Sequence, residues 1–212
     1  MLFGNSIKAF KEHIANHFWV YGTICAIALI GIVAGAFTVN AMSQQQLGEL
    51  SDYMNGFLKI FADQNVSSGD LLMISLRDNF KILLLVIVSG LAIIGIPFVY
   101  FLVGSSAFVT GFTIGAMIKF KGMHGMVMAL ITVIPSEFFI LPALIVVGAN
   151  SVLFSKDLLK KLTGKSFSRN TFVEDIIAYL CMCMICAIIM MVGILFEAYL
   201  SPLILKLLLP VF

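Results

Sequence analysis

The sequence offers few side chains that could perform chemistry, and the two that stand out are glutamates inside apolar runs. Glu137 follows Pro135 in one such run, and Glu197 lies near the end of the last one. Placing a charge at the centre of a bilayer is costly, so an ionisable residue there marks function. Two hypotheses follow for Glu137. It lines a substrate path in a discontinuous helix, or it is neutral or hydrogen-bonded at a kink.

Enzyme chemistry needs further groups, and the sequence does not assemble them. Ser136 and His124 are far apart along the chain, and no Gly-x-Ser-x-Gly pattern surrounds the serine. The 3 histidines form no His-Glu-x-x-His motif. Cys181, Cys183 and Cys186 lie in an apolar run, where 100° per residue turns the first two to different sides of a helix. We therefore expect no catalytic site, no metal and no cofactor.

Composition places the chain in lipid. Of its 212 residues, 61% are hydrophobic and 11% are charged, whereas a soluble domain is about half apolar and about a quarter charged. A globule of this size could not hide that excess from water. The net charge of +2 argues against a nucleic-acid partner. We expect one all-α membrane domain over residues 1–212, with the lipid bilayer as its surroundings.

About five transmembrane helices are predicted, because a helix needs about 20 apolar residues to cross a bilayer. The runs are Trp19 to Met42, Ile82 to Val103, Ser105 to Ile118, Met123 to Ser155, and Ile176 to Leu200. The uncharged stretch from residue 82 to 118 is too long for one span, so a turn is predicted near Gly104 to Ser106. Pro135 and Pro142 predict that the fourth run is a Pro-broken helix or a helix pair.

The charges of the connecting segments predict their sides of the membrane. Ser155 to Thr171 is basic, which is typical of a cytoplasmic loop. Ser43 to Asn79 is mainly acidic, which suits the extracytoplasmic side. Both agree with a cytoplasmic N-terminus, where Asn5 to Phe18 is predicted to form an interfacial amphipathic helix. Five spans then place the C-terminal tail outside.

An apolar stripe runs along the predicted helix Gln44 to Asp63 on the outer side. Its members recur at steps of three and four residues: Leu47, Leu50, Met54, Phe57, Leu58 and Phe61. One interpretation is a helix that rests on lipid or on the ends of its own bundle. The other is a docking face for a partner helix. These six residues are the candidate partner-docking set.

Two glycine pairs have the spacing that lets helix backbones approach each other closely. They are Gly31 with Gly35 and Gly111 with Gly115. Such pairs join helices within one chain or between two chains. A homodimer is therefore one alternative that the sequence leaves open.

The order of these features resembles the stage II sporulation protein M family. The resemblance rests on Trp19 at the head of the first span, the two glycine pairs, the amphipathic outer segment, the stretch from Ile134 to Leu144, Gly148 and the basic loop. It implies a non-catalytic polytopic protein in the septal or engulfing membrane that is needed for forespore engulfment. The implied partners are two membrane-anchored peptidoglycan hydrolases, one of lytic transglycosylase type and one of amidase or endopeptidase type.

Two functions from different classes are therefore expected. The leading one is a membrane scaffold that recruits and positions these wall hydrolases. The alternative is a small transporter or channel component built around the helix break that comprises Pro135, Glu137 and Pro142.

Overall fold

A computed structural model describes residues 17–63, 68–92, 95–163 and 169–208, and nearly all of them are helical. The helices are α2 (Phe18–Ala41), α3 (Gln44–Asp63), α4 (Ser68–Leu91), α5 (Gly95–Thr132), α6 (Ile134–Thr163), α7 (Arg169–Leu195), the π-helix η1 (Phe196–Leu200) and α8 (Ser201–Leu208). The all-α class predicted from the sequence is confirmed. The predicted N-terminal helix at residues 5–18 lies almost wholly outside the described residues.

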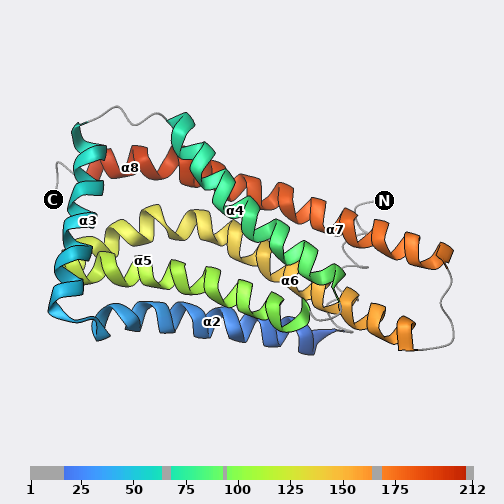
Figure 1. Cartoon of the computed structure of the whole chain (residues 1–212). Coiled ribbons are helices and arrows are strands. Elements are labelled where there is room, and N and C mark those ends of the chain that lie inside the picture. Colours follow the sequence, from blue (N-terminus) through green and yellow to red (C-terminus); the bar gives the residue numbers. More distant parts are fainter. Residues whose placement is uncertain (1–16, 64–67, 93–94, 164–168, 209–212) are drawn as a thin grey trace.

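The long helices lie side by side in an elongated bundle, and α3 crosses one end of it (Figure 1). The chain runs along α2 to α3 and returns along α4 to the opposite end. The first part of α5 leads back to the α3 end, and the chain then returns through α6 before α7 and α8 complete the path. As a result, α3 and α8 lie at one end, whereas the end of α6 and the start of α7 lie at the other.

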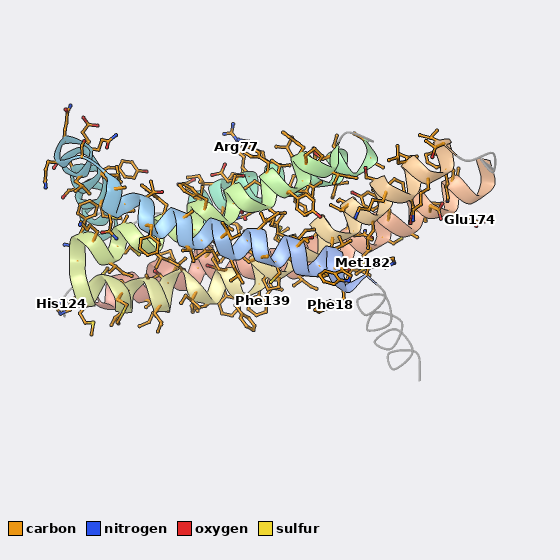
Figure 2. All side chains as sticks on the ribbon, turned by 90° about the horizontal axis from the view of Figure 1, so that it is seen from below. Phe18, Arg77, His124, Phe139, Glu174 and Met182 are labelled. Carbon is orange, nitrogen blue, oxygen red and sulfur yellow. The ribbon has the colours of Figure 1, made fainter. Side chains whose placement is uncertain are left out.

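Two glycines, neither of them in the predicted turn, let the chain reverse direction around α5. Gly122 has φ 56° and ψ −130°, a backbone conformation that side-chain-bearing residues rarely adopt. It splits α5 into two helices, and the chain doubles back there (Figure 2). At the other reversal, a Cβ on Gly95 would collide with the carbonyl of Ser89. Only glycine permits that close approach.

The predicted turn at Gly104 to Ser106 is therefore wrong. These residues lie in the middle of the first helix of α5. Gly104 instead allows α2 and α5 to pack closely, since a Cβ on Gly31 of α2 would lie 2.6 Å from the Gly104 carbonyl oxygen. The predicted span from Ile82 to Val103 is consequently divided between α4 and α5.

The fourth predicted run, Met123 to Ser155, is divided into a helix pair, because α5 ends at Thr132 and α6 begins at Ile134, one residue before Pro135. A second break at Pro142 is not observed. Helix α6 is continuous from Ile134 to Thr163 and holds Pro142 inside it. Pro135 lies in its first turn, where a missing N–H costs little. The departure from helix is confined to Val133, whose carbonyl oxygen still accepts from the Glu137 N–H at 3.1 Å.

Four helical stretches of the described chain are long and apolar enough to cross a membrane: Phe18–Ala41, Gly95–Thr132, Ile134–Thr163 and Phe172–Ile204. Helix α4 is not one of these four, and its first half carries charges that include Asp70, Arg77 and Asp78. It still lies along the bundle beside the others (Figure 1). The chain is thus a polytopic membrane protein.

Helix α6 forms the centre of the bundle, because it contacts α2, α4, α5 and α7. Its buried face carries Leu144, Val147 and Val152, which meet Ile24 of α2 and Val86 of α4 in one apolar core. The outer faces are also apolar, and Figure 2 shows their side chains projecting from the bundle. Exposed apolar side chains on several helices are expected where the surrounding medium is lipid.

Candidate functional site

The two glutamates singled out in the sequence approach each other inside the bundle. Glu137 lies in the first turn of α6, and its Oε1 accepts a hydrogen bond of 2.9 Å from Thr110 Oγ1 on α5. Its Oε2 is buried and has no hydrogen-bond partner among the described residues. Glu197 lies in η1, where its Oε2 accepts from Asn79 Nδ2 at 3.5 Å. The two carboxyl groups are close enough for a Coulombic interaction.

The π-helix η1 places Glu197 in this cluster, which we call the carboxyl cluster (Glu137, Glu197, Thr110 and Asn79). A π-turn inserts one residue into a helix and often marks a functional site. Contacts at both ends of η1 stabilise the π-turn. The ring centroids of Phe196 and Phe139 are 5.6 Å apart in a stacked arrangement, and Ser201 Oγ donates a hydrogen bond of 2.7 Å to the Thr132 carbonyl. The chain therefore holds the local distortion through contacts with α5 and α6.

The carboxyl cluster draws one residue each from α4, α5, α6 and η1. Sequence reasoning found both glutamates but missed their proximity and the roles of Thr110 and Asn79. The available signal was that both acids lie within apolar runs, so a shared polar site was the natural place for them. Two carboxyl groups in a lipid-facing bundle can hold a proton or a cation between them.

The other residues considered for chemistry lie outside this cluster or donate hydrogen bonds to backbone carbonyls. Ser136 Oγ donates to the Val133 carbonyl at 2.9 Å. His124 lies at the chain reversal beside Gly122 (Figure 2). Cys183 is buried and receives a contact of 3.8 Å from Asn150 Nδ2, whereas Cys181 is exposed. Within the described residues, no three His, Cys, Asp or Glu side chains are grouped to hold a metal ion.

The four predicted packing glycines form a single seam between α2 and α5. A Cβ on Gly35 would collide with the Phe108 carbonyl, and one on Gly111 with the Ile32 carbonyl. A Cβ on Gly115 would lie 2.8 Å from the Ala36 carbonyl oxygen, and Gly31 meets Gly104 in the same way. These glycines therefore join helices within one chain, and their faces are covered.

The predicted docking stripe lies on α3, whose bounds match the predicted helix. Leu47, Leu50 and Met54 are each half-buried. α8 contacts α3 and contributes to the end of the bundle that α3 crosses. Phe57, Leu58 and Phe61 belong to the same helix, but their side chains lie outside the described residues. The described part of the stripe is thus engaged in part by its own chain and exposed in part.

A second polar cluster, at the opposite end, joins α4, α6 and α7. The Tyr179 hydroxyl donates to the Ile87 carbonyl at 2.9 Å and lies 2.8 Å from Ser151 Oγ. Ser155 Oγ donates to the Ala92 carbonyl at 2.9 Å. Carbonyls near a helix end lack partners inside the helix, and a buried one is costly if left unpaired. These side chains therefore stabilise the end of α4 within the bundle.

The predicted basic loop at residues 155–171 is mostly helical. α6 continues to Thr163 and α7 begins at Arg169. The two helices are tied by an ion pair between Lys161 and Asp175. Amphipathic continuation of both helices explains the difference, since Leu158 and Lys161 turn inward whereas Lys156 and Lys160 are exposed.

Comparison with known proteins gives one match. The family model described as stage II sporulation protein M matches residues 5–202, which is nearly the whole chain. No curated protein and no solved structure matches.

Proposed function

Because the chain belongs to the stage II sporulation protein M family and is a sporulation-related membrane protein, we propose that it is the non-catalytic scaffold of a peptidoglycan-remodelling complex. In this proposal it recruits and positions two membrane-anchored wall hydrolases at the septal membrane during engulfment. One hydrolase is of lytic transglycosylase type and the other of amidase or endopeptidase type.

The observation that carries the proposal is the placement of α3 across one end of the bundle (Figure 1). A helix in this position presents a surface beside the membrane rather than within it. The three described residues of its stripe, Leu47, Leu50 and Met54, are half-buried, and Tyr53 next to them is 73% exposed. A partner segment that follows its membrane anchor out of the lipid would meet α3 first. The glycine seam is already filled by α2 and α5, so α3 is the better docking surface.

The test is co-purification of the tagged protein from sporulating cells in mild detergent, with mass spectrometry of the retained proteins. The double variant Leu50→Lys and Met54→Lys places charges on the half-buried stripe. We expect it to insert normally but to retain about tenfold less of both hydrolases, because burying an unpaired charge in an apolar contact is unfavourable.

Gly48→Lys is the matched control for this experiment. Gly48 is exposed, and a Cβ added there meets nothing within 4 Å. It adds a lysine to the same helix away from the stripe, so retention of the hydrolases should be unchanged. Equal retention by the stripe variant and the control would contradict α3 as the docking surface.

A second candidate function is supported by the carboxyl cluster. A transporter or channel component would move a proton or cation through Glu137, and the nearby Glu197 supplies the second group that such a path needs. In this candidate, Glu137→Gln abolishes a pH- or cation-dependent flux into reconstituted vesicles. Glu174→Gln, an exposed position, leaves the flux unchanged. An equal flux in both variants, or none in the unaltered protein, would contradict it.

A further inference from the structure

The end of the bundle opposite α3 carries a two-helix projection, formed by Lys156–Thr163 of α6 and residues 169–178 of α7. Figure 1 shows that α6 and α7 extend past the ends of α2, α4 and α5 there. Ser155 is level with the end of α4, because its hydroxyl donates to the Ala92 carbonyl. At 1.5 Å per residue, the α6 part of the projection is about 12 Å long.

Aromatic and apolar residues mark where the apolar part of the bundle ends. Trp19 lies in the first turn of α2 and is 83% exposed, and tryptophan favours the boundary between lipid and water. In Figure 2 Phe18 and Met182 lie at a similar level along the bundle, whereas Glu174 lies at the tip of the projection. Each headgroup layer is about 5 to 8 Å thick, so a bilayer boundary near Trp19 would bring the start of the projection close to the headgroups.

One face of the projection combines lysines with leucines. Lys156, Leu159 and Lys160 are exposed, and the last two lie three and four residues after the first, so they share one face of α6. Leu162 beside them is 52% exposed. Lysine stems lie along apolar surface while their ammonium groups stay in a polar layer. This mixture suits neither open water nor the hydrocarbon interior.

The charges of this face are only weakly engaged by the protein. Lys160 approaches Asp157 at 3.9 Å, and both side chains are largely exposed. An ion pair of that kind contributes little. The remaining described lysine of this segment, Lys161, is directed to Asp175 inside the projection.

We propose that the face formed by Lys156, Leu159 and Lys160 binds anionic phospholipid headgroups. The two ammonium groups contact headgroup phosphates, and the exposed Leu159 between them lies against the same lipid. Charge complementarity selects an anionic lipid, because basic residues beside a membrane attract anionic headgroups electrostatically. This lipid site goes beyond the proposed scaffold function and is independent of it.

The natural cysteines supply a local probe for this lipid. In a Cys25→Ser variant, Cys181 is the exposed cysteine of the described chain, since Cys183 and Cys186 are buried. A fluorophore on Cys181 lies near the same end of the bundle, because Tyr179, two residues earlier, donates a hydrogen bond to the Ile87 carbonyl at the end of α4. The labelled protein is reconstituted in phosphatidylcholine vesicles that contain a fixed fraction of brominated phosphatidylglycerol or brominated phosphatidylcholine. The ratio of the two quenching constants measures local enrichment of the anionic lipid.

We expect several-fold stronger quenching by phosphatidylglycerol, and we expect added salt to weaken it. Lys156→Gln with Lys160→Gln should bring the ratio close to one, since each lysine near the surface contributes a factor of about five. Lys156→Arg with Lys160→Arg should keep the ratio. Lys119→Gln with Lys121→Gln, at the opposite end of the bundle, should also keep it. A ratio of one in the unaltered protein, or a high ratio in the Gln variant, would overturn the proposal.

Discussion

At the residue scale, the polar side chains of this protein show how an apolar bundle accommodates groups that lipid excludes. Tyr179 and Ser155 donate to carbonyls at the end of α4, and Thr110 donates to Glu137. Each of these bonds joins two different helices, so a polar group that would be costly alone becomes a specific link. Glu137 Oε2 is the exception, because it is buried without a hydrogen-bond partner among the described residues. In the transporter candidate proposed above, that atom is the one that would bind the proton or cation.

Single glycines decide the helix packing, and Gly111 offers a sharp test. A Cβ there would collide with the backbone carbonyl of Ile32, which cannot rotate away. We expect Gly111→Ala to lower the free energy of unfolding by about 1 to 3 kcal/mol or more, because overpacking forces the helices apart. The measurement is the thermal unfolding midpoint in detergent.

Gly22 provides the matched control, since it lies in α2 and a Cβ there meets nothing within 4 Å. Gly22→Ala should leave stability unchanged or raise it by up to about 1 kcal/mol through better helix propensity. A loss of stability for Gly22→Ala equal to that for Gly111→Ala would show that the seam between α2 and α5 is not the cause.

At the scale of elements, the sequence correctly predicted the helices that have a clear periodicity or a uniform hydropathy. The first span and the amphipathic helix were placed within a residue or two, because each has a uniform pattern bounded by polar residues. The reversals around α5 were misplaced. Gly104 packs against α2, whereas Gly95 and Gly122 lie at chain reversals, and the sequence alone does not distinguish these roles of one residue type.

The two prolines differed in what they indicated. Pro135 marked the division of the fourth run, since α6 begins one residue before it, whereas Pro142 is held inside a continuous α6 in the middle of the bundle. The sequence placed both glutamates of the carboxyl cluster within apolar runs, but it did not show that they approach each other. Glu137 and Glu197 are brought together by the return of the chain through α7 and by the extra residue in η1, and neither effect leaves a periodic signal.

At the scale of the whole molecule, the bundle has two different ends. One end carries α3, the reversal at Gly122 and α8, whereas the other carries the projection of α6 and α7 (Figures 1 and 2). The proposed docking helix and the proposed lipid face therefore lie at opposite ends. A scaffold with this polarity could hold wall hydrolases on one side of the membrane while it contacts headgroups on the other.

The last prediction concerns the orientation of these ends in the cell membrane. In a Cys25→Ser, Cys181→Ser background, the two exposed positions Gly48 and Lys156 are changed singly to cysteine. Basic segments are retained in the cytoplasm, so a membrane-impermeant maleimide should label Gly48→Cys in intact cells. It should label Lys156→Cys only after permeabilisation. The reverse pattern would place α3 in the cytoplasm and exclude it from contact with wall enzymes. Labelling of both positions from outside would contradict the separation of the two ends by the bilayer.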